Sequence, residues 1–173
     1  NFIFINYIMD DKLENIKNNF YKTHQKKKII GVSQQKKELA LNCINEIPFN
    51  DFINECIVVH ENNIFFYYSK IKPFIHSQIF SNVLQYTLTI IYKILEKYNN
   101  YNIISDIHSL TMSGIQRCYP LILMFFDNND FKNSLEKVEN IDLHNCPSCI
   151  KNIHAFLLPL FKKYNIVSKF RYF

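Results

Sequence analysis

The sequence lacks the residues that several common enzyme motifs require. It has only two glycines in 173 residues and no tryptophan. This rules out a Gly-rich phosphate loop and a dinucleotide-binding fingerprint, and no Gly-x-Ser-x-Gly elbow of the hydrolases occurs. Paired carboxylates and a recognisable arrangement of nucleophile and base are also missing. We therefore expect a protein that is not an enzyme and uses no cofactor.

Long apolar runs are absent as well. No stretch approaches the roughly 18 apolar residues that a membrane-spanning helix needs. The apolar segment 2–5 lacks the cationic start and the small-residue cleavage site of a signal peptide. The five cysteines show no spacing typical of a disulfide framework, which favours a reducing compartment. We expect a cytoplasmic protein, with peripheral membrane contact as a further expectation.

What the chain does contain is enough apolar and basic sequence for a folded domain with a cationic arm. Hydrophobic residues make up 48% and aromatic residues 16%, which excludes a disordered chain. The net charge is +5, and eight lysines lie within residues 12–37. This arm is either a solvated face or a surface that contacts anionic membranes. The aromatic residues 65–68 could stack on bases, but no RNA-binding motif accompanies them, so we expect no nucleic-acid partner.

Apolar periodicity predicts an α/β protein. Helical spacing is weak over 1–37 and clear over 36–47, 79–98 and 115–126, with a further short helix over 131–137. Runs at 56–59 and 64–68 predict a β-hairpin, and 101–106 predicts a buried strand. We expect a helical, basic N-terminal arm over 1–47 and one main domain over 48–173. The main domain should be a single mixed, largely parallel sheet flanked by helices.

The C-terminal segment carries the most informative pattern. Residues 138–143 alternate as a strand, and the segment His144–Pro147 interrupts it. An amphipathic helix follows over 150–161, Asn165 is a plausible stop, and 166–173 predicts a second strand. A strand, a helix and a second strand of this length suit a parallel crossover.

Two groups of polar residues have side chains that could form a chemical site. His144, Cys146, Cys149 and His154 have the residue types of a zinc site or, through the two cysteines, of a thiol–disulfide pair. Their spacing matches no standard zinc motif, and we interpret the cysteines as incidental at a strand-to-helix turn, with no metal bound. Asp106 lies at a strand end and is expected to cap the turn that follows.

The C-terminal pattern resembles a known family. The sequence Asn145-x-Pro147, an apolar helix with Pro159, then Leu160-Phe161 and, after a short linker, 168–170 (Ser-Lys-Phe) is similar to the CRAL-TRIO (Sec14-like) lipid-binding domain. The order of predicted elements from residue 57 onward is also similar. The segment that follows the last strand in that family has no counterpart here, and its N-terminal helical domain is reduced to residues 1–47 or absent.

The resemblance implies binding rather than catalysis. In that family the corresponding helix is a mobile gate over a hydrophobic pocket, so the ligand would be a phospholipid or another lipid, bound for transfer or sensing. The inward-facing, lipid-binding residues would be Ile153, Phe156, Leu157 and Leu160. The hinges of the gate would be Cys146, Pro147 and Asn165. The basic arm would favour contact with an anionic membrane surface.

Two alternatives without a lipid pocket remain open. A CRAL-TRIO-like domain could be a regulatory module that binds a protein partner. A STAS-like regulatory domain has a similar order of strands and helices, and Ser109 or Ser113 would then lie near its phosphorylated loop. Pro147 and the helix pattern after it favour the CRAL-TRIO interpretation.

Overall fold

The computed structural model describes the backbone of residues 2–27 and 31–173, and the side chains of residues 9–27 and 31–173. The described residues confirm the predicted α/β class with a single mixed sheet. The helices are α1 (Phe2–Thr23), α2 (Val32–Glu46), α3 (Phe49–Cys56), α4 (Tyr68–Ile71), α5 (Phe80–Lys97), α6 (Met112–Asp127), α7 (Asn129–Ser134) and α8 (Ile150–Lys163). The strands are β1 (Ile57–His60), β2 (Asn63–Tyr67), β3 (Tyr101–Asp106), β4 (Val138–His144) and β5 (Phe170–Tyr172).

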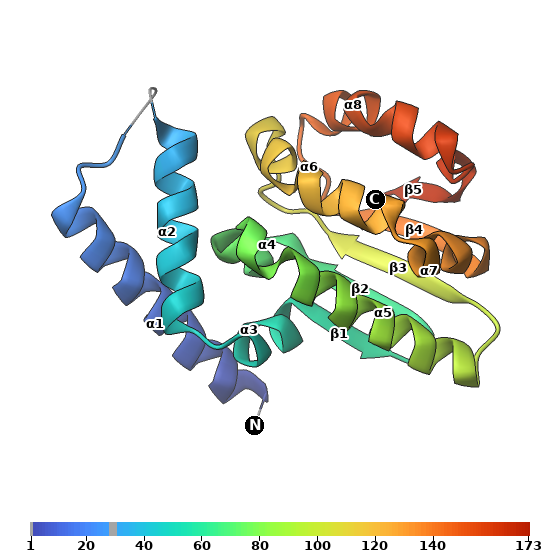
Figure 1. Cartoon of the computed structure of the whole chain (residues 1–173), viewed down its shortest axis with the longest axis horizontal. Coiled ribbons are helices and arrows are strands. Elements are labelled where there is room, and N and C mark those ends of the chain that lie inside the picture. The colour runs from blue at the N-terminus through green and yellow to red at the C-terminus, as the bar shows by residue number, and fades with distance from the viewer. Residues whose placement is uncertain (1, 28–30) are drawn as a thin grey trace.

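The strands lie in the sheet in the order in which they occur in the chain, β1-β2-β3-β4-β5. The hairpin β1–β2 is antiparallel, and β2, β3, β4 and β5 are parallel to one another. Right-handed crossovers that advance in one direction place their helices on the same face of a sheet. Figure 1 accordingly shows α5, α6 and α8 following one another along the sheet. One face of the sheet therefore packs against these helices.

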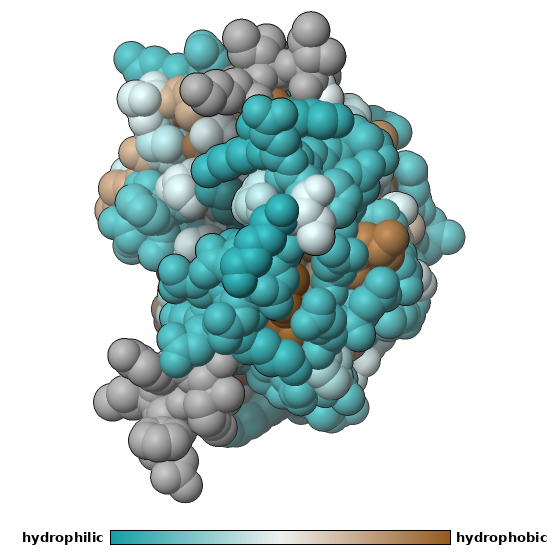
Figure 2. All heavy atoms as spheres, turned by 90° about the vertical axis from the view of Figure 1, so that its left-hand side faces the viewer, coloured by the Kyte–Doolittle hydropathy of each residue, from teal (hydrophilic) through white to brown (hydrophobic). Residues whose placement is uncertain are grey.

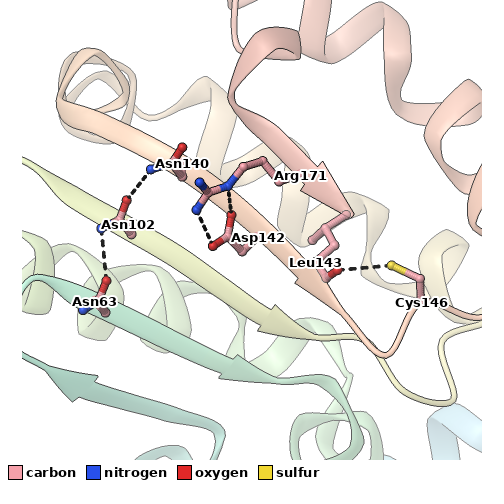
Figure 3. Close-up of polar contacts among 7 residues, drawn as sticks. All are labelled: Asn63, Asn102, Asn140, Asp142, Leu143, Cys146 and Arg171. Carbon is pink, nitrogen blue, oxygen red and sulfur yellow. Dashed lines mark hydrogen bonds and ion pairs between the residues drawn. The ribbon is translucent and has the colours of Figure 1, made fainter. Parts of the chain in front are cut away.

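The other face of the sheet is polar along its centre. Asn63, Asn102 and Asn140 form a ladder of side-chain hydrogen bonds across β2, β3 and β4, each 3.0 Å long. Arg171 on β5 donates two hydrogen bonds, of 2.6 and 2.7 Å, to the carboxylate of Asp142 on β4 (Figure 3). Side chains alternate between the two faces of a strand, so these polar residues alternate with Ile64, Ile103 and Ile141 on the helix-covered face.

The N-terminal arm is a helical hairpin that shares the core of the rest of the molecule. Figure 1 shows α1 and α2 side by side, beside the sheet and its helices. Leu13 and Ile16 of α1 and Cys43 of α2 are buried in the same apolar cluster as Phe52 of α3. Seen from the side of α1 and α2, the surface is mainly hydrophilic, with apolar atoms in small patches (Figure 2). The arm therefore combines a buried apolar stripe with a solvated polar face.

Three predicted elements differ from the structure. For residues 49–56 only a strand beginning at residue 56 was predicted. These residues form α3 instead, because Pro48 ends α2 and lies at the N-cap of a new helix. The second hairpin strand ends at Tyr67, and Tyr68 begins α4. The predicted strand 166–173 was too long, since Val167–Lys169 forms a 3-10 turn and only Phe170–Tyr172 pairs with β4.

None of the helices in the described ranges is both long enough and apolar enough to cross a membrane.

Candidate functional site

The principal candidate site is an apolar cavity of about 340 Å³ between the sheet and its helices. Ile64, Ile103 and Ile141 line it from strands β2, β3 and β4. Its remaining lining comes mostly from apolar side chains of α5, α6, α7 and α8. Concave sites of about 300 to 1,000 Å³ with mainly apolar walls are typical of small-molecule binding sites.

Helix α8 closes one side of this cavity with one face of its apolar stripe. Ile153 and Leu157 line the cavity and are 3% and 7% exposed. Ile150 and Phe161 lie one turn to either side and also line it. Residues four apart lie on the same helix face, so this spacing follows directly from the helical period. The predicted inward orientation of Ile153 and Leu157 agrees with the structure, and their contact with a lipid stays a prediction.

Phe156 and Leu160 do not line the cavity, contrary to the predicted inward orientation. Phe156 is 40% exposed, and its ring centroid lies 5.1 Å from that of Tyr119 on α6. Leu160 is partly buried against the core. Each residue turns about 100° around a helix, so positions 156 and 160 lie on the flank of α8 beside α6. The apolar stripe of α8 was predicted to face the cavity alone. It lies partly against the cavity and partly against α6.

The predicted hinge residues lie at the two ends of α8. Asn145, just before the hinge residues Cys146 and Pro147, has a positive φ of 54°. Cys146 donates a thiol hydrogen bond to the Leu143 carbonyl at 3.2 Å, and the Pro147 carbonyl accepts from Ile150. At the other end Asn165 has a φ of 53°. The backbone therefore changes direction sharply on both sides of α8, and hinge motion there stays a prediction.

The two cysteines and two histidines considered for zinc point to four different neighbours. Cys146 bonds to Leu143, as Figure 3 shows, and Cys149 lies 3.6 Å from the Leu110 carbonyl. His144 stacks on Phe173, and His154 bonds to the Tyr172 hydroxyl. Among the described residues no group of three or more potential ligands comes together. These four side chains do not form a common site.

Asp106 caps the turn after β3, as predicted. Its carboxylate accepts a hydrogen bond of 2.9 Å from the backbone N–H of His108. It also accepts one of 3.0 Å from the side chain of Asn145, which ties the ends of β3 and β4 together. Asp106 is thus engaged on both oxygens in structural hydrogen bonds.

Beside the cavity, at Tyr68, lies a group of polar and charged residues that could not be identified from the sequence. Tyr68 lines the cavity, and Lys72 lies in the 3-10 turn Lys72–Phe74 with its ammonium nitrogen 5.9 Å from the Tyr68 ring centre. That ammonium also donates to the Ser109 hydroxyl at 3.3 Å. Arg117 lies on α6, close enough to Tyr68 to influence its ionisation. These residues come from two segments, 68–72 and 109–117, that are far apart in the sequence, and neither segment alone shows a motif that would predict their meeting.

Burial shifts the pKa values of Tyr68 and Lys72 in this group. It raises the pKa of Tyr68 to about 12, although the nearby Arg117 opposes the shift. Burial is also the main reason why the pKa of Lys72 is lowered, and Lys36, Arg117 and Lys17 add repulsion. Two buried polar atoms here, the Tyr68 hydroxyl and Nε of Arg117, have no hydrogen-bond partner.

Searches with family models, against curated proteins and against solved structures found no match to this chain. The function must therefore be argued from the cavity and the residues around it.

Proposed function

We propose that this chain binds a hydrophobic ligand, a phospholipid or another lipid, in the cavity beneath α8, and that it transfers or senses this ligand without catalysis. The observation that carries the proposal is the cavity itself. Its volume of about 340 Å³ and its almost entirely apolar lining suit hydrocarbon. Each CH₂ group that leaves water for such a site stabilises the complex by about 0.8 kcal/mol.

The lining of the cavity favours an apolar ligand over water. The walls offer water almost no hydrogen-bond partner, so water inside the cavity is poorly satisfied. A bound apolar ligand would recover much of the lost packing, so ligand binding and folding stability would be coupled.

The cavity walls suit binding rather than covalent chemistry. Cys56 and Cys118 both line the cavity, and burial raises the pKa of both thiols, that of Cys118 to about 11. A thiol needs its thiolate form to act as a nucleophile, so these two are held in the unreactive state. Cavity residues of this kind support an apolar binding site.

Helix α8 is the part of the wall best suited to open. Ile153 and Leu157 belong to the buried apolar cluster and also line the cavity, so part of the apolar face of α8 lies against the cavity. Pro159 inside α8 removes one backbone hydrogen bond of the helix. Rotation at Cys146, Pro147 and Asn165 would let the helix swing away. The resemblance of this segment to the CRAL-TRIO gate supports the same motion.

The membrane contact and the compartment that we propose are based on the charge of the N-terminal arm and on the state of the cysteines. The lysines of the N-terminal arm would favour contact with an anionic membrane surface from which the ligand is taken. The five cysteines are all free, which suits the cytoplasm.

The test is native mass spectrometry of the purified protein, with extraction of any lipid that it carries. We expect a lipid at near-stoichiometric amount. Leu157→Glu should abolish loading, because it places a carboxylate in the cavity, whereas Phe156→Glu is the matched control on the exposed flank of the same helix. Circular dichroism should show that both variants keep the fold.

An empty protein that takes up neither phospholipid nor sterol from vesicles would overturn the proposal. A regulatory module that binds a protein partner would then be the better hypothesis. Equal loading of Leu157→Glu and the unmodified protein would also place the ligand outside this cavity.

A further inference from the structure

Beside the cavity, at Tyr68, several cations lie close together without an ion pair among the described residues. Lys72 lies near three other cations, Lys36, Arg117 and Lys17, which lower its pKa in addition to burial. The ion pairs among the described residues involve Lys70 and Arg171, and none involves these four side chains. Cations brought together without a carboxylate repel one another, so the group attracts an anion more strongly than a single cation would.

Two buried polar groups in the same place also lack partners. Tyr68 is 8% exposed, and its hydroxyl has no partner at hydrogen-bond distance, although the Arg117 side chain lies close beside it. Nε of Arg117 is buried and unpaired too. Buried polar groups in proteins nearly always have a hydrogen-bond partner, so each exception needs an explanation. A hydroxyl and a guanidinium N–H are donors that an oxyanion could satisfy together.

The orphan groups lie against the beginning of helix α6. The Tyr68 hydroxyl occupies the space that a Cβ atom at Gly114, in the first turn of α6, would fill. The ammonium of Lys72 reaches Ser109 in the loop that leads into the same helix. Helix α6 has 16 residues, and its N-terminus carries the positive end of the helix dipole. Side-chain cations, unpaired donors and a helix N-terminus thus converge.

We propose that Tyr68, Lys72 and Arg117, with the first turn of α6, bind a phosphate-class oxyanion directly beside the apolar cavity, where Tyr68 forms part of its wall. Because Tyr68 also lines the cavity, a single ligand can occupy both regions if it joins an apolar tail to a phosphate. Such a ligand is a phosphate-bearing lipid, and this form of the proposal rests on the proposed function. A free phosphate or a small phosphorylated molecule is the other possible source of the same chemistry.

The lipid source is tested by competition between two lipids that differ only in the phosphate. Phosphatidic acid and diacylglycerol with the same acyl chains are offered in equal amounts in phosphatidylcholine vesicles, and the lipids recovered on the protein are identified by mass. We expect at least about a tenfold preference for phosphatidic acid, the effect of losing one hydrogen bond to a charged group. Lys72→Gln and Arg117→Gln should lose this preference and still load diacylglycerol. Lys93→Gln, an exposed lysine on α5, is the control and should keep the preference.

The free-anion source is tested with inorganic phosphate alone, by calorimetry and by the shift in Tm at constant ionic strength. Binding by the unmodified protein that is lost in Lys72→Gln, Arg117→Gln and Tyr68→Phe would support the site even without any lipid preference. If neither the lipid preference nor phosphate binding is seen, the site is overturned. Loading of diacylglycerol in that case would leave the proposed cavity function intact, whereas a protein that binds phosphate and no lipid would keep the site and lose the cavity function.

Stability of the ligand-free protein separates a binding role from a structural one. If Lys72 and Arg117 bind an anion, their removal relieves repulsion, and Tm in phosphate-free buffer should stay the same or rise. A clear fall in Tm for both Gln variants, in a protein that also shows no phosphate binding, would mean that these cations only hold the fold together.

Discussion

Gly114 is the residue whose small size has the clearest structural reason. It is buried in the first turn of α6, and an added Cβ would overlap the Tyr68 hydroxyl. Thr111 caps the same turn, because its hydroxyl oxygen accepts a hydrogen bond of 3.1 Å from the backbone N–H of Gly114. The absence of a side chain at this position thus lets the tyrosine lie against the helix.

We predict that Gly114→Ala lowers the free energy of unfolding by about 1–3 kcal/mol, because the buried tyrosine has little room to move. In a Tyr68→Phe background the same change should be neutral or stabilising, since the overlapping hydroxyl is gone and alanine favours the helix. Urea unfolding of the four proteins of this double-mutant cycle measures the coupling. Equal effects of Gly114→Ala in both backgrounds would show that the hydroxyl is not the obstacle.

Glu55 on α3 is a second residue with an unusual environment. Both of its carboxylate oxygens are buried without a hydrogen bond, and the nearest cation, Lys70, lies 3.7 Å away. Burial raises the pKa of Glu55 above its ordinary value of 4.5, with Lys70 opposing the shift. The folded protein therefore binds the proton of this side chain more tightly than the unfolded chain does.

The pH dependence of stability follows from the direction of this shift. Below pH 4.5 Glu55 is protonated in both the folded and the unfolded chain, so its ionisation does not lower the free energy of unfolding. As the pH rises through the raised pKa, its ionisation destabilises the fold. Glu55→Gln should therefore exceed the unmodified protein in unfolding free energy by about 1 kcal/mol at pH 7, and the two should converge on acidification. Chemical unfolding at several pH values, with the exposed Glu96→Gln as control, checks this; a gap that widens towards low pH would contradict it.

At the scale of elements, α8 ends in a well-defined Schellman motif. The N–H of Ile166 donates to the Phe161 carbonyl and that of Asn165 to the Lys162 carbonyl, both at 3.1 Å. Asn165 lies between them with a left-handed φ of 53°. The buried Ile166 follows directly. Asn165 therefore sets both the end of the helix and the path of the chain into β5.

We predict that Asn165→Ala destabilises the protein by about 1–2 kcal/mol, because a Cβ-bearing residue other than asparagine or aspartate resists the left-handed conformation. Asn165→Gly should leave stability unchanged or slightly higher. Asn152→Ala, at an exposed position inside the same helix, is the control and should have little effect. Similar losses for Ala and Gly at position 165 would point to the side chain of Asn165 rather than to its backbone.

The sequence predicted the main elements better than it predicted their ends. Apolar spacing located α2, α5, α6 and α8, because each buries one continuous stripe. It missed α3, in which Phe52, Ile53 and Cys56 are buried within only 8 residues. It also overextended β5, because the apolar Ile166 is buried by the helix cap and not by the sheet.

The same limit applies to the candidate site. The inward orientation of Ile153 and Leu157 could be predicted, because it depends on the period of one helix. The outward position of Phe156 could not, because it depends on where α6 packs. Tyr68 and Lys72 meet Arg117 only when segment 68–72 packs against α6, and the periodicity of either segment does not predict which segments will pack together.

At the scale of the whole molecule, the mixed and largely parallel sheet was predicted, and its one-sided helical cover explains the cavity. Helices on a single face have to span a sheet of five strands. The apolar residues of β2, β3 and β4 face the helices that cover this side of the sheet, and the cavity lies between these strands and the helices. The polar ladder of Asn63, Asn102 and Asn140 shows that the opposite face needs no such cover.

The order β1-β2-β3-β4-β5 has a further consequence for how the protein can be made. Each strand after the first pairs with a strand that has already been synthesised, and no later strand has to insert between two earlier ones. Pairings close in sequence are the fastest to form, and domains generally begin to fold from the N-terminus as the chain leaves the ribosome. The sheet can therefore grow during translation in the order in which its strands emerge, with α8 and β5 added last to close the cavity.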